Sequence, residues 1–188
     1  MATQGPGFTM ADFLSSFGPV VRPSGARPLV VHDQDLETIP AGSVPNPTEL
    51  RIAGTLPTTT FELFRQVIPP GESSDMQRHY HETVHFVIAG EGHSEIEGGG
   101  DGEDGQGGED ENVVWRTGSF VYTPPWAWHR HYNDSAENPV EFLTIENSRL
   151  LSLFGLVRRE SAGLATIAEA HARFDTPPDQ PFDSRETP

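Results

Sequence analysis

The sequence predicts an all-β domain, a small barrel with short terminal helices. The 188 residues include 19 Gly and 17 Pro, and these lie between short apolar runs. Short runs separated by turn residues are typical of strands joined by tight turns. The length fits one domain with tails, and it is sufficient to bury a core without disulfide bonds.

The predicted strands divide the chain into an N-terminal arm and loop (1–59), a barrel (60–147) and a C-terminal helix and tail (148–188). Pro69-Pro70-Gly71, the Gly90 to Gly92 turn and Gly118 interrupt the apolar runs of the barrel. We expect short helices at 11–17 and over 150–174, where Leu164 and Ile167 lie near helical spacing. The expected strands are 61–68, 79–89, 93–97, 113–115, 119–123, 129–132 and 140–146.

One segment inside the barrel, 98–112, is rich in Gly and acidic residues. It has no apolar residue to bury, so we interpret it as a solvated insertion in a hairpin. Its acids lack the spacing of an EF-hand loop, so calcium is not favoured.

The composition excludes several classes of function. The net charge of −16 disfavours binding to nucleic acid and to anionic membranes. The chain contains no Cys, which excludes disulfides and thiolate metal sites, and no Lys, which excludes Schiff-base chemistry. Its first residues do not form a signal peptide and no run is long enough to cross a membrane, so we expect a cytoplasmic protein.

Six of the eight histidines lie between positions 79 and 131. His79, His81 and His85 differ by even numbers, as do His129 and His131. Even separation places side chains on one face of a strand. Each buried imidazole nitrogen needs a partner, and a metal ion can supply one. The alternative is a set of hydrogen-bonded core or surface histidines.

The second group of histidines lies in a motif that resembles the cupin superfamily, a double-stranded β-helix or jelly-roll barrel. Gly118, Pro124, His129 and Asn133 match the second cupin motif at every spacing, although Trp126 stands where Gly is usual. The stretch 123–134 is similar to gentisate 1,2-dioxygenase and its relatives, ring-cleaving enzymes that usually contain two cupins. The resemblance covers about 60–147.

The first cupin motif fits in two registers. The gapless register runs from Gly71 to Gly90 and places Gln77, His79 and Thr83 at ligand positions. The shifted register ends at Gly92 and places His79, His81 and His85 there. We favour the shifted register, with His79, His81, His85 and His129 as the metal ligands.

The resemblance implies a mononuclear Fe(II) dioxygenase that takes O₂ and an aromatic or diketone-like small molecule, inserts oxygen and cleaves a C–C bond. Zn, Ni or Mn would instead indicate a non-redox lyase, isomerase or cyclase. A non-catalytic binder of small molecules is a third alternative. Gln77 and Thr83 would favour a cupin without metal.

Further residues are assigned by their position relative to the ligands. His131 is the candidate acid–base residue, and Gln77, Trp126 and Trp128 are candidates for the substrate pocket. Arg65 and Arg78 could bind a substrate carboxylate, whereas Arg130 should point outward. We expect a homodimer that pairs through the N-terminal arm and the segment 150–156.

Overall fold

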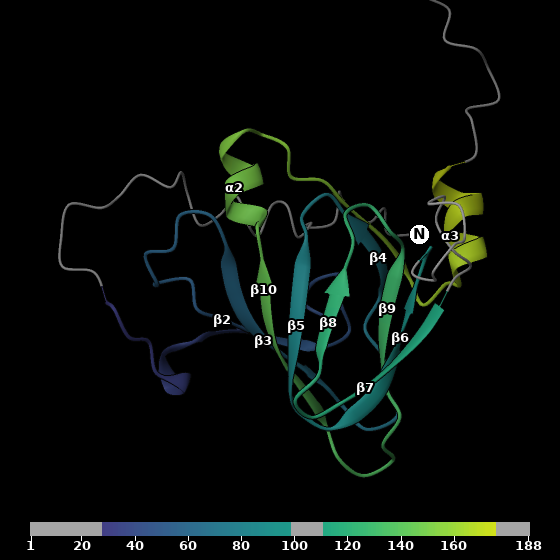
Figure 1. The fold of residues 1–188 in the computed structure, drawn as a ribbon, viewed down its shortest axis with the longest axis horizontal. Coiled ribbons are helices and arrows are strands. Elements are labelled where there is room, and N and C mark those ends of the chain that lie inside the picture. The colour runs from purple at the N-terminus through teal and green to yellow at the C-terminus, as the bar shows by residue number, and fades with distance from the viewer. Residues whose placement is uncertain (1–27, 99–110, 176–188) are drawn as a thin grey trace, which may run out of the picture.

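Two antiparallel sheets face each other and form a barrel (Figure 1). The fold is taken from a computed structural model, which describes residues 28–98 and 111–175. Strand order is β1-β2-β3-β10-β5-β8 in the six-stranded sheet and β11-β4-β9-β6-β7 in the five-stranded sheet. The strands are β1 (Glu37–Ile39), β2 (Glu49–Ile52), β3 (Glu62–Ile68), β4 (Met76–His79), β5 (Thr83–Ala89), β6 (Glu91–Ile96), β7 (Glu111–Arg116), β8 (Phe120–Thr123), β9 (His129–Asn133), β10 (Val140–Glu146) and β11 (Arg159–Gly163).

The prediction of an all-β barrel with short helices is confirmed, but three segments differ from expectation. The region predicted as arm and loop contributes β1 and β2, which extend the sheet beside β3. The predicted strand 79–89 is divided, because β4 ends at His79 and β5 begins at Thr83. The predicted helix 150–174 is interrupted by β11, which pairs with β4 between α2 (Ser148–Leu153) and α3 (Ile167–Phe174). The helix predicted at 11–17 lies outside the described residues.

Alternation along the strands builds an apolar core in one part of the barrel interior. This cluster consists of Ile68, Val87, Ile96, Trp115, Val121, Val140 and Phe142. Phe142 connects it to the histidines, because its ring centroid lies 5.4 Å from that of His85 and 5.5 Å from that of His131. Beyond this cluster the interior holds buried polar side chains, these histidines among them, and a functional site is expected there.

A second packed cluster lies outside the five-stranded sheet, under α3. Figure 1 shows α3 beside β4 and β9. Thr166 and Glu169 form a capping box that fixes the start of this helix. Ile167 and Ala170 face inward and pack with Met76, Trp128 and Ala162. The C-terminal segment therefore covers the outer face of the two strands that carry His79 and His129.

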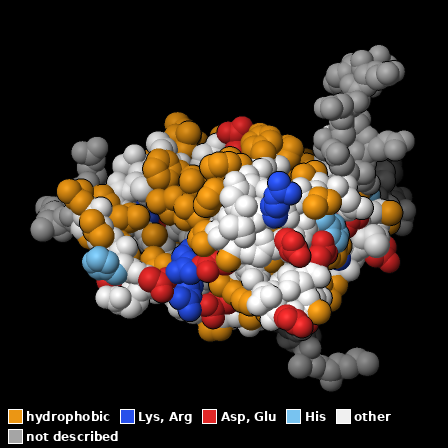
Figure 2. All heavy atoms as spheres, turned by 60° about the horizontal axis from the view of Figure 1, so that its bottom comes forward, with side chains coloured by type: hydrophobic (Ala, Val, Ile, Leu, Met, Phe, Trp, Pro, Cys, Tyr) orange, Lys and Arg blue, Asp and Glu red, His pale blue; other side chains and the backbone are white. Residues whose placement is uncertain are grey.

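Part of the surface is apolar. Figure 2 shows hydrophobic side chains gathered over a broad area of the face in view. Exposed residues include Phe120 and Tyr122 of β8, Leu153 at the end of α2, and Phe154 and Leu156 after it. Leu153, Phe154 and Leu156 lie in the segment 150–156, through which we predict pairing in a homodimer. Their exposure does not test the homodimer, which stays a prediction. Among the described residues, no helix has the length and apolar character needed to cross a membrane.

Candidate metal centre

Five histidines meet inside the barrel. His79 ends β4, His81 lies in the connection to β5, and His85 lies within β5. His129 and His131 both come from β9 and are 0 % exposed, and the other three are 2–4 % exposed. The structure therefore brings together all five histidines that even spacing placed on one face.

The five rings form a continuous cluster. The rings of His79 and His81 are stacked, with centroids 3.7 Å apart and planes within 5° of parallel. His79 meets the His129 ring edge-on at 4.7 Å, and His85 meets the His131 ring edge-on at 4.4 Å. The centroids of His129 and His131 are 5.7 Å apart.

The structure agrees with the glycine spacing of the gapless register, while it places the histidines of the shifted register at the site. Gly71 and Gly90 both have positive φ, at +68° and +96°, at the turns that bound β4 and β5. Gly92 instead lies within β6. Gln77 is paired with His129 across the sheet, at the position of the first ligand in the gapless register. His81 and His85 reach the site from positions at which this register has no ligand.

Backbone carbonyls fix the tautomers of two histidines. Nδ1 of His79 lies 2.8 Å from the His81 carbonyl oxygen, and Nδ1 of His129 lies 2.9 Å from that of Ala127. Because a carbonyl oxygen only accepts, each Nδ1 carries the proton when the ring is neutral. The lone pair is then on Nε2 in both rings. This is the arrangement in which histidine binds a metal through Nε2.

A carboxylate contacts the other ring nitrogen, Nε2, in His81. Its Nε2 lies 3.1 Å from Oε2 of Glu146, the last residue of β10. Burial alone would raise the pKa of Glu146, but contacts with His81 and Ser148 outweigh it and the pKa is lowered. Glu146 is therefore an acceptor at neutral pH, His81 donates from Nε2, and the lone pair of the neutral ring is on Nδ1.

Hydroxyl groups hold the other two histidines. His85 Nδ1 lies 3.0 Å from Thr144 Oγ1, and His131 Nδ1 lies 2.7 Å from Ser94 Oγ, which also accepts from Trp115 Nε1. A hydroxyl can donate or accept, so these contacts do not fix the tautomer. Nε2 is buried without a hydrogen-bond partner among the described residues in His85, His129 and His131.

Four of these imidazoles are neutral at neutral pH. Burial is the largest cause that lowers the pKa values of His79, His85 and His129 well below the usual range, and neighbouring histidines lower them further. Burial lowers the pKa of His131 to about 4. A group with this pKa is a weak base at neutral pH, which favours His131 as a ligand or hydrogen-bonding group over the predicted acid–base role.

A cavity opens beside the cluster between the two sheets. Its volume is about 370 Å³, including the part open to solvent. His79, His81 and His85 line it, whereas His129 and His131 lie behind these rings. The other lining residues are Asn46, Leu50, Phe64, Gln66, Gln77, Thr83, Glu146 and Arg159.

Of the predicted pocket residues, Gln77 lines the cavity and the two tryptophans do not. Trp128 is 0 % exposed and packs in the cluster under α3. Trp126 packs outside against Tyr80, with the guanidinium groups of Arg78 and Arg158 over its ring. Its φ is +62°, a conformation that favours Gly, which agrees with its position where the cupin motif usually has Gly.

The arginines show where sequence reasoning succeeded and failed. Arg65 pairs with Asp33 and Glu141, and Arg78 pairs with Glu160 and Asp175, so neither lines the cavity. Arg130 does not line the cavity either, and it donates to the carbonyls of Gly163 and Ala165, as expected for an outward residue. The arginine that reaches the cavity is Arg159 of β11, which no motif identified.

The donor set fits a divalent transition metal, although the rings are not arranged around one point. Three neutral imidazoles, those of His85, His129 and His131, have a buried Nε2 without a partner among the described residues, and such donors suit Fe, Zn or Ni. Among the described residues, no group of three His, Asp or Glu side chains is positioned as it stands to hold an ion. The parallel rings of His79 and His81 cannot both direct a lone pair at one ion, so binding would require a rotation of one ring.

Comparison with known proteins identifies the fold family. The model of the cupin domain matches residues 64–146. Residues 64–146 are therefore similar to the cupin domain. The predicted resemblance is thereby confirmed, and β1, β2 and the segment after β10 extend the matched cupin on both sides.

Two curated relatives are dioxygenases by name. The chain is 33 % identical over 107 residues to gentisate 1,2 dioxygenase 1 of Aquipseudomonas alcaligenes, covering 56 % of this chain and 27 % of the relative. It is 27 % identical over 107 residues to 5-aminosalicylate 1,2-dioxygenase of Comamonas sp, covering 57 % and 24 %. The cupin chain thus spans about a quarter of the length of these relatives.

Solved structures support the fold. A cupin-2 domain from Rhodospirillum rubrum superposes with a TM-score of 0.51 at 21 % identity, covering 80 % of this chain and 89 % of that one. A variant of salicylate 1,2-dioxygenase from Pseudoaminobacter salicylatoxidans, in complex with gentisate, gives a TM-score of 0.52 at 12 % identity. It covers 66 % of this chain and 31 % of that one.

Proposed function

We propose that this cupin is an Fe(II)-dependent dioxygenase that cleaves a C–C bond of an aromatic or diketone-like small molecule with insertion of oxygen. The observation that carries the proposal is the cluster of five buried histidines beside a cavity. Four of the five, all but His79, have a buried ring nitrogen without a partner among the described residues, which is costly unless a ligand satisfies it. The names of the two curated relatives support the choice of reaction.

The residues that would hold the metal are His79 and His129 through Nε2, together with His85 and His81. Backbone carbonyls hold His79 and His129 in the tautomer that metal binding needs. His81 would join after leaving Glu146 or would bind through Nδ1. Fe(II), when bound, would supply the redox chemistry that allows O₂ to react with an electron-rich substrate.

The other residues of the site would bind and isolate the substrate. Leu50 and Phe64 provide an apolar side to the cavity, which suits a ring. His131, with its Nε2 buried and unpaired, would hydrogen-bond in the site or serve as a fifth nitrogen ligand. The apolar core around Phe142 closes the interior side and excludes water from it.

A second candidate function is non-catalytic binding of a small molecule. The gapless register places Gln77 and Thr83 where ligands would stand, and both line the cavity. Non-redox chemistry with Zn, Ni or Mn would use the same histidines. Both alternatives predict that no O₂ is consumed.

Oxygen consumption is therefore the test. The protein is loaded with Fe(II) without air and mixed with gentisate, 5-aminosalicylate, salicylate or a diketone in an oxygen electrode. We expect substrate-dependent O₂ uptake that the His129→Ala variant and a zinc-loaded sample do not show. Equal traces for the iron-loaded, zinc-loaded and variant proteins would overturn the dioxygenase proposal.

A further inference from the structure

The cavity has one side that is built to donate hydrogen bonds. Arg159 reaches it from β11, a strand that lies outside the matched cupin domain, and the Arg159 side chain is 5 % exposed. A buried guanidinium needs a countercharge and several acceptors. Asp75, whose side chain is 0 % exposed, supplies the charge through Oδ2, 2.6 Å from Arg159 Nη2.

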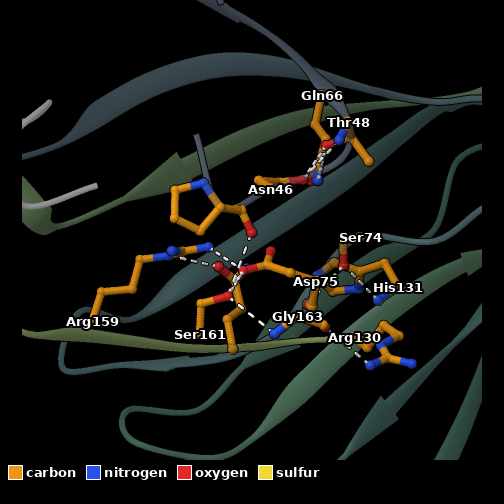
Figure 3. Close-up of polar contacts among 12 residues, drawn as sticks. Asn46, Thr48, Gln66, Ser74, Asp75, Arg130, His131, Arg159, Ser161 and Gly163 are labelled. Carbon is orange, nitrogen blue, oxygen red and sulfur yellow. Dashed lines mark hydrogen bonds and ion pairs between the residues drawn. The ribbon is translucent and has the colours of Figure 1, made fainter. Parts of the chain in front are cut away.

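The arginine and its carboxylate are held by neighbours on both sides. Ser161 Oγ donates to the same Asp75 oxygen at 2.6 Å (Figure 3). Arg159 Nε donates to Gln77 Oε1 at 2.8 Å. Gln77, Arg159 and Asp75 therefore form a chain of hydrogen bonds that connects β11 to β4. Within the described residues, neither Nη1 of Arg159 nor the amide nitrogen of Gln77 makes a side-chain hydrogen bond or ion pair.

This chain determines what Gln77 can do. An amide binds a metal through its oxygen, and the oxygen of Gln77 is already accepting from Arg159. Arginine is only a donor, so the orientation of the amide is fixed with its NH₂ group on the other side. Gln77 lies opposite His129 and lines the cavity together with Arg159, so both side chains bring N–H donors to the cavity lining.

We propose that Gln77 and Arg159 form an oxyanion-binding subsite for a carboxylate of the substrate, with Arg159 acting also as the residue that positions Gln77. Gln77 is then a donor to the substrate and is not a metal ligand. The proposal depends on the proposed function only in taking this cavity as the substrate site. A carboxylate has two oxygens, which matches one amide donor and one guanidinium donor.

The other charges around the cavity agree with this assignment. Among the cavity-lining residues that the structure describes, Glu146 is the one carboxylate, and it comes from β10 in the opposite sheet, where it is paired with His81. The positive charge of Arg159 also lowers the pKa values of two neighbouring histidines. Burial is the main cause of the lowered pKa values of His79 and His129, and Arg159 contributes.

The test is binding of benzoate and benzamide to the metal-free protein by calorimetry. The two probes have the same ring, but only benzoate has two anionic oxygens. We expect wild type to prefer benzoate, and Gln77→Met to lose about 10-fold or more of its affinity for benzoate with little change for benzamide. Arg159→Lys keeps the charge but loses the Nε donor, so it should reduce the same preference.

A cobalt titration of the same proteins separates the two roles of Gln77. We expect Gln77→Met to bind Co²⁺ as wild type does, because residue 77 is not a ligand. Gln77→Glu should weaken benzoate binding and strengthen Co²⁺ binding, because it replaces a donor by a carboxylate. Gln34→Glu makes the same change on the surface and should alter neither.

Two results would overturn the subsite. Equal affinity of wild type for benzoate and benzamide would show that no oxyanion is recognised. Loss of Co²⁺ affinity in Gln77→Met would show that Gln77 is a ligand. Arg159→Lys risks unfolding through Asp75, but Gln77→Met leaves that ion pair intact and keeps the test decisive. Because these probes need neither iron nor O₂, the outcome is independent of the dioxygenase activity.

Discussion

The inner and outer faces of β4 and β9 are formed by alternate residues of the same two strands, yet they differ in what they hold. The inner face carries Gln77, His79, His129 and His131 around a polar site. The outer face carries Arg78 and Arg130, and Trp128 packs there under α3. The inner residues leave nitrogens unpaired in the interior, whereas the outer residues are packed and mostly paired. The comparison supports the proposal that the inner face binds ligands, whereas the outer face packs against α3 and stabilises the fold.

The largest expected effect is on the inner face. His129→Ala removes the ring nitrogen Nε2. The carbonyl oxygen of Ala127 already fixes the tautomer that leaves the lone pair on this atom. We expect affinity for Co²⁺, measured by spectroscopic titration, to fall by more than about 100-fold, beyond the loss typical of residues that merely support a ligand. The free energy of unfolding of the metal-free protein should change little. An unchanged Co²⁺ affinity would remove His129 from the ligand set.

On the outer face, Trp128→Ala should have the opposite profile. It deletes a fully buried side chain between β9 and α3, and such deletions cost about 3–5 kcal/mol. Urea unfolding measures the loss, and the Co²⁺ affinity of the folded variant should be close to wild type. If Co²⁺ affinity fell together with stability, the two faces would not be separable.

Ser94→Ala tests a residue that supports the inner face. Ser94 Oγ contacts His131 Nδ1 and accepts from Trp115 Nε1, so its removal leaves a buried donor without a partner. We expect a loss of about 1–3 kcal/mol in the free energy of unfolding. Ser119→Ala, in which the hydroxyl accepts from an exposed backbone amide, is the matched control and should cost less. Equal losses in the two variants would contradict the role of Ser94.

The smallest effect concerns pH and α3. A hydrogen bond to Asp175 is the main cause that raises the pKa of His171 above 6.5, and Glu97 contributes. A raised pKa in the folded protein stabilises it below pH 6.5, and this contribution is lost as pH rises through the folded pKa. Because His171 is 39 % exposed, we expect only about 0.2–1 kcal/mol. His171→Gln should reduce stability at pH 6 but not at pH 9, as measured by urea unfolding; an equal change at both pH values would contradict this.

The fold and the inward histidines could be predicted from local pattern. Strand alternation placed His79, His85, His129 and His131 inside, and the turn glycines marked the strand ends. The two registers of the first motif differ by two residues. Strand alternation therefore places the same side chains inside in both, and it does not distinguish them. Of the two glycines that could end the motif, Gly90 has a positive φ and lies at a turn, whereas Gly92 lies within β6, which agrees with the glycine spacing of the gapless register.

The parts that sequence could not predict depend on distant contacts. Arg159 is one of 12 arginines, and its partners Asp75 and Gln77 are 84 and 82 residues away. Trp128 was assigned to the pocket because its neighbour is His129, but α3 covers it from outside. The helical spacing of Leu164 and Ile167 predicts one helix over 150–174, and only the pairing of β11 with β4 makes residues 159–163 a strand.

Metal analysis tests the central claim most directly. Wild type, His79→Ala and the outer-face control Trp126→Phe should be purified freshly and in parallel. Their metal content is then measured by elemental analysis. We expect near-stoichiometric iron in wild type and in the control, and little in His79→Ala. No metal in wild type, and none after incubation with Fe(II), would contradict an iron centre and leave a cupin that binds a small molecule.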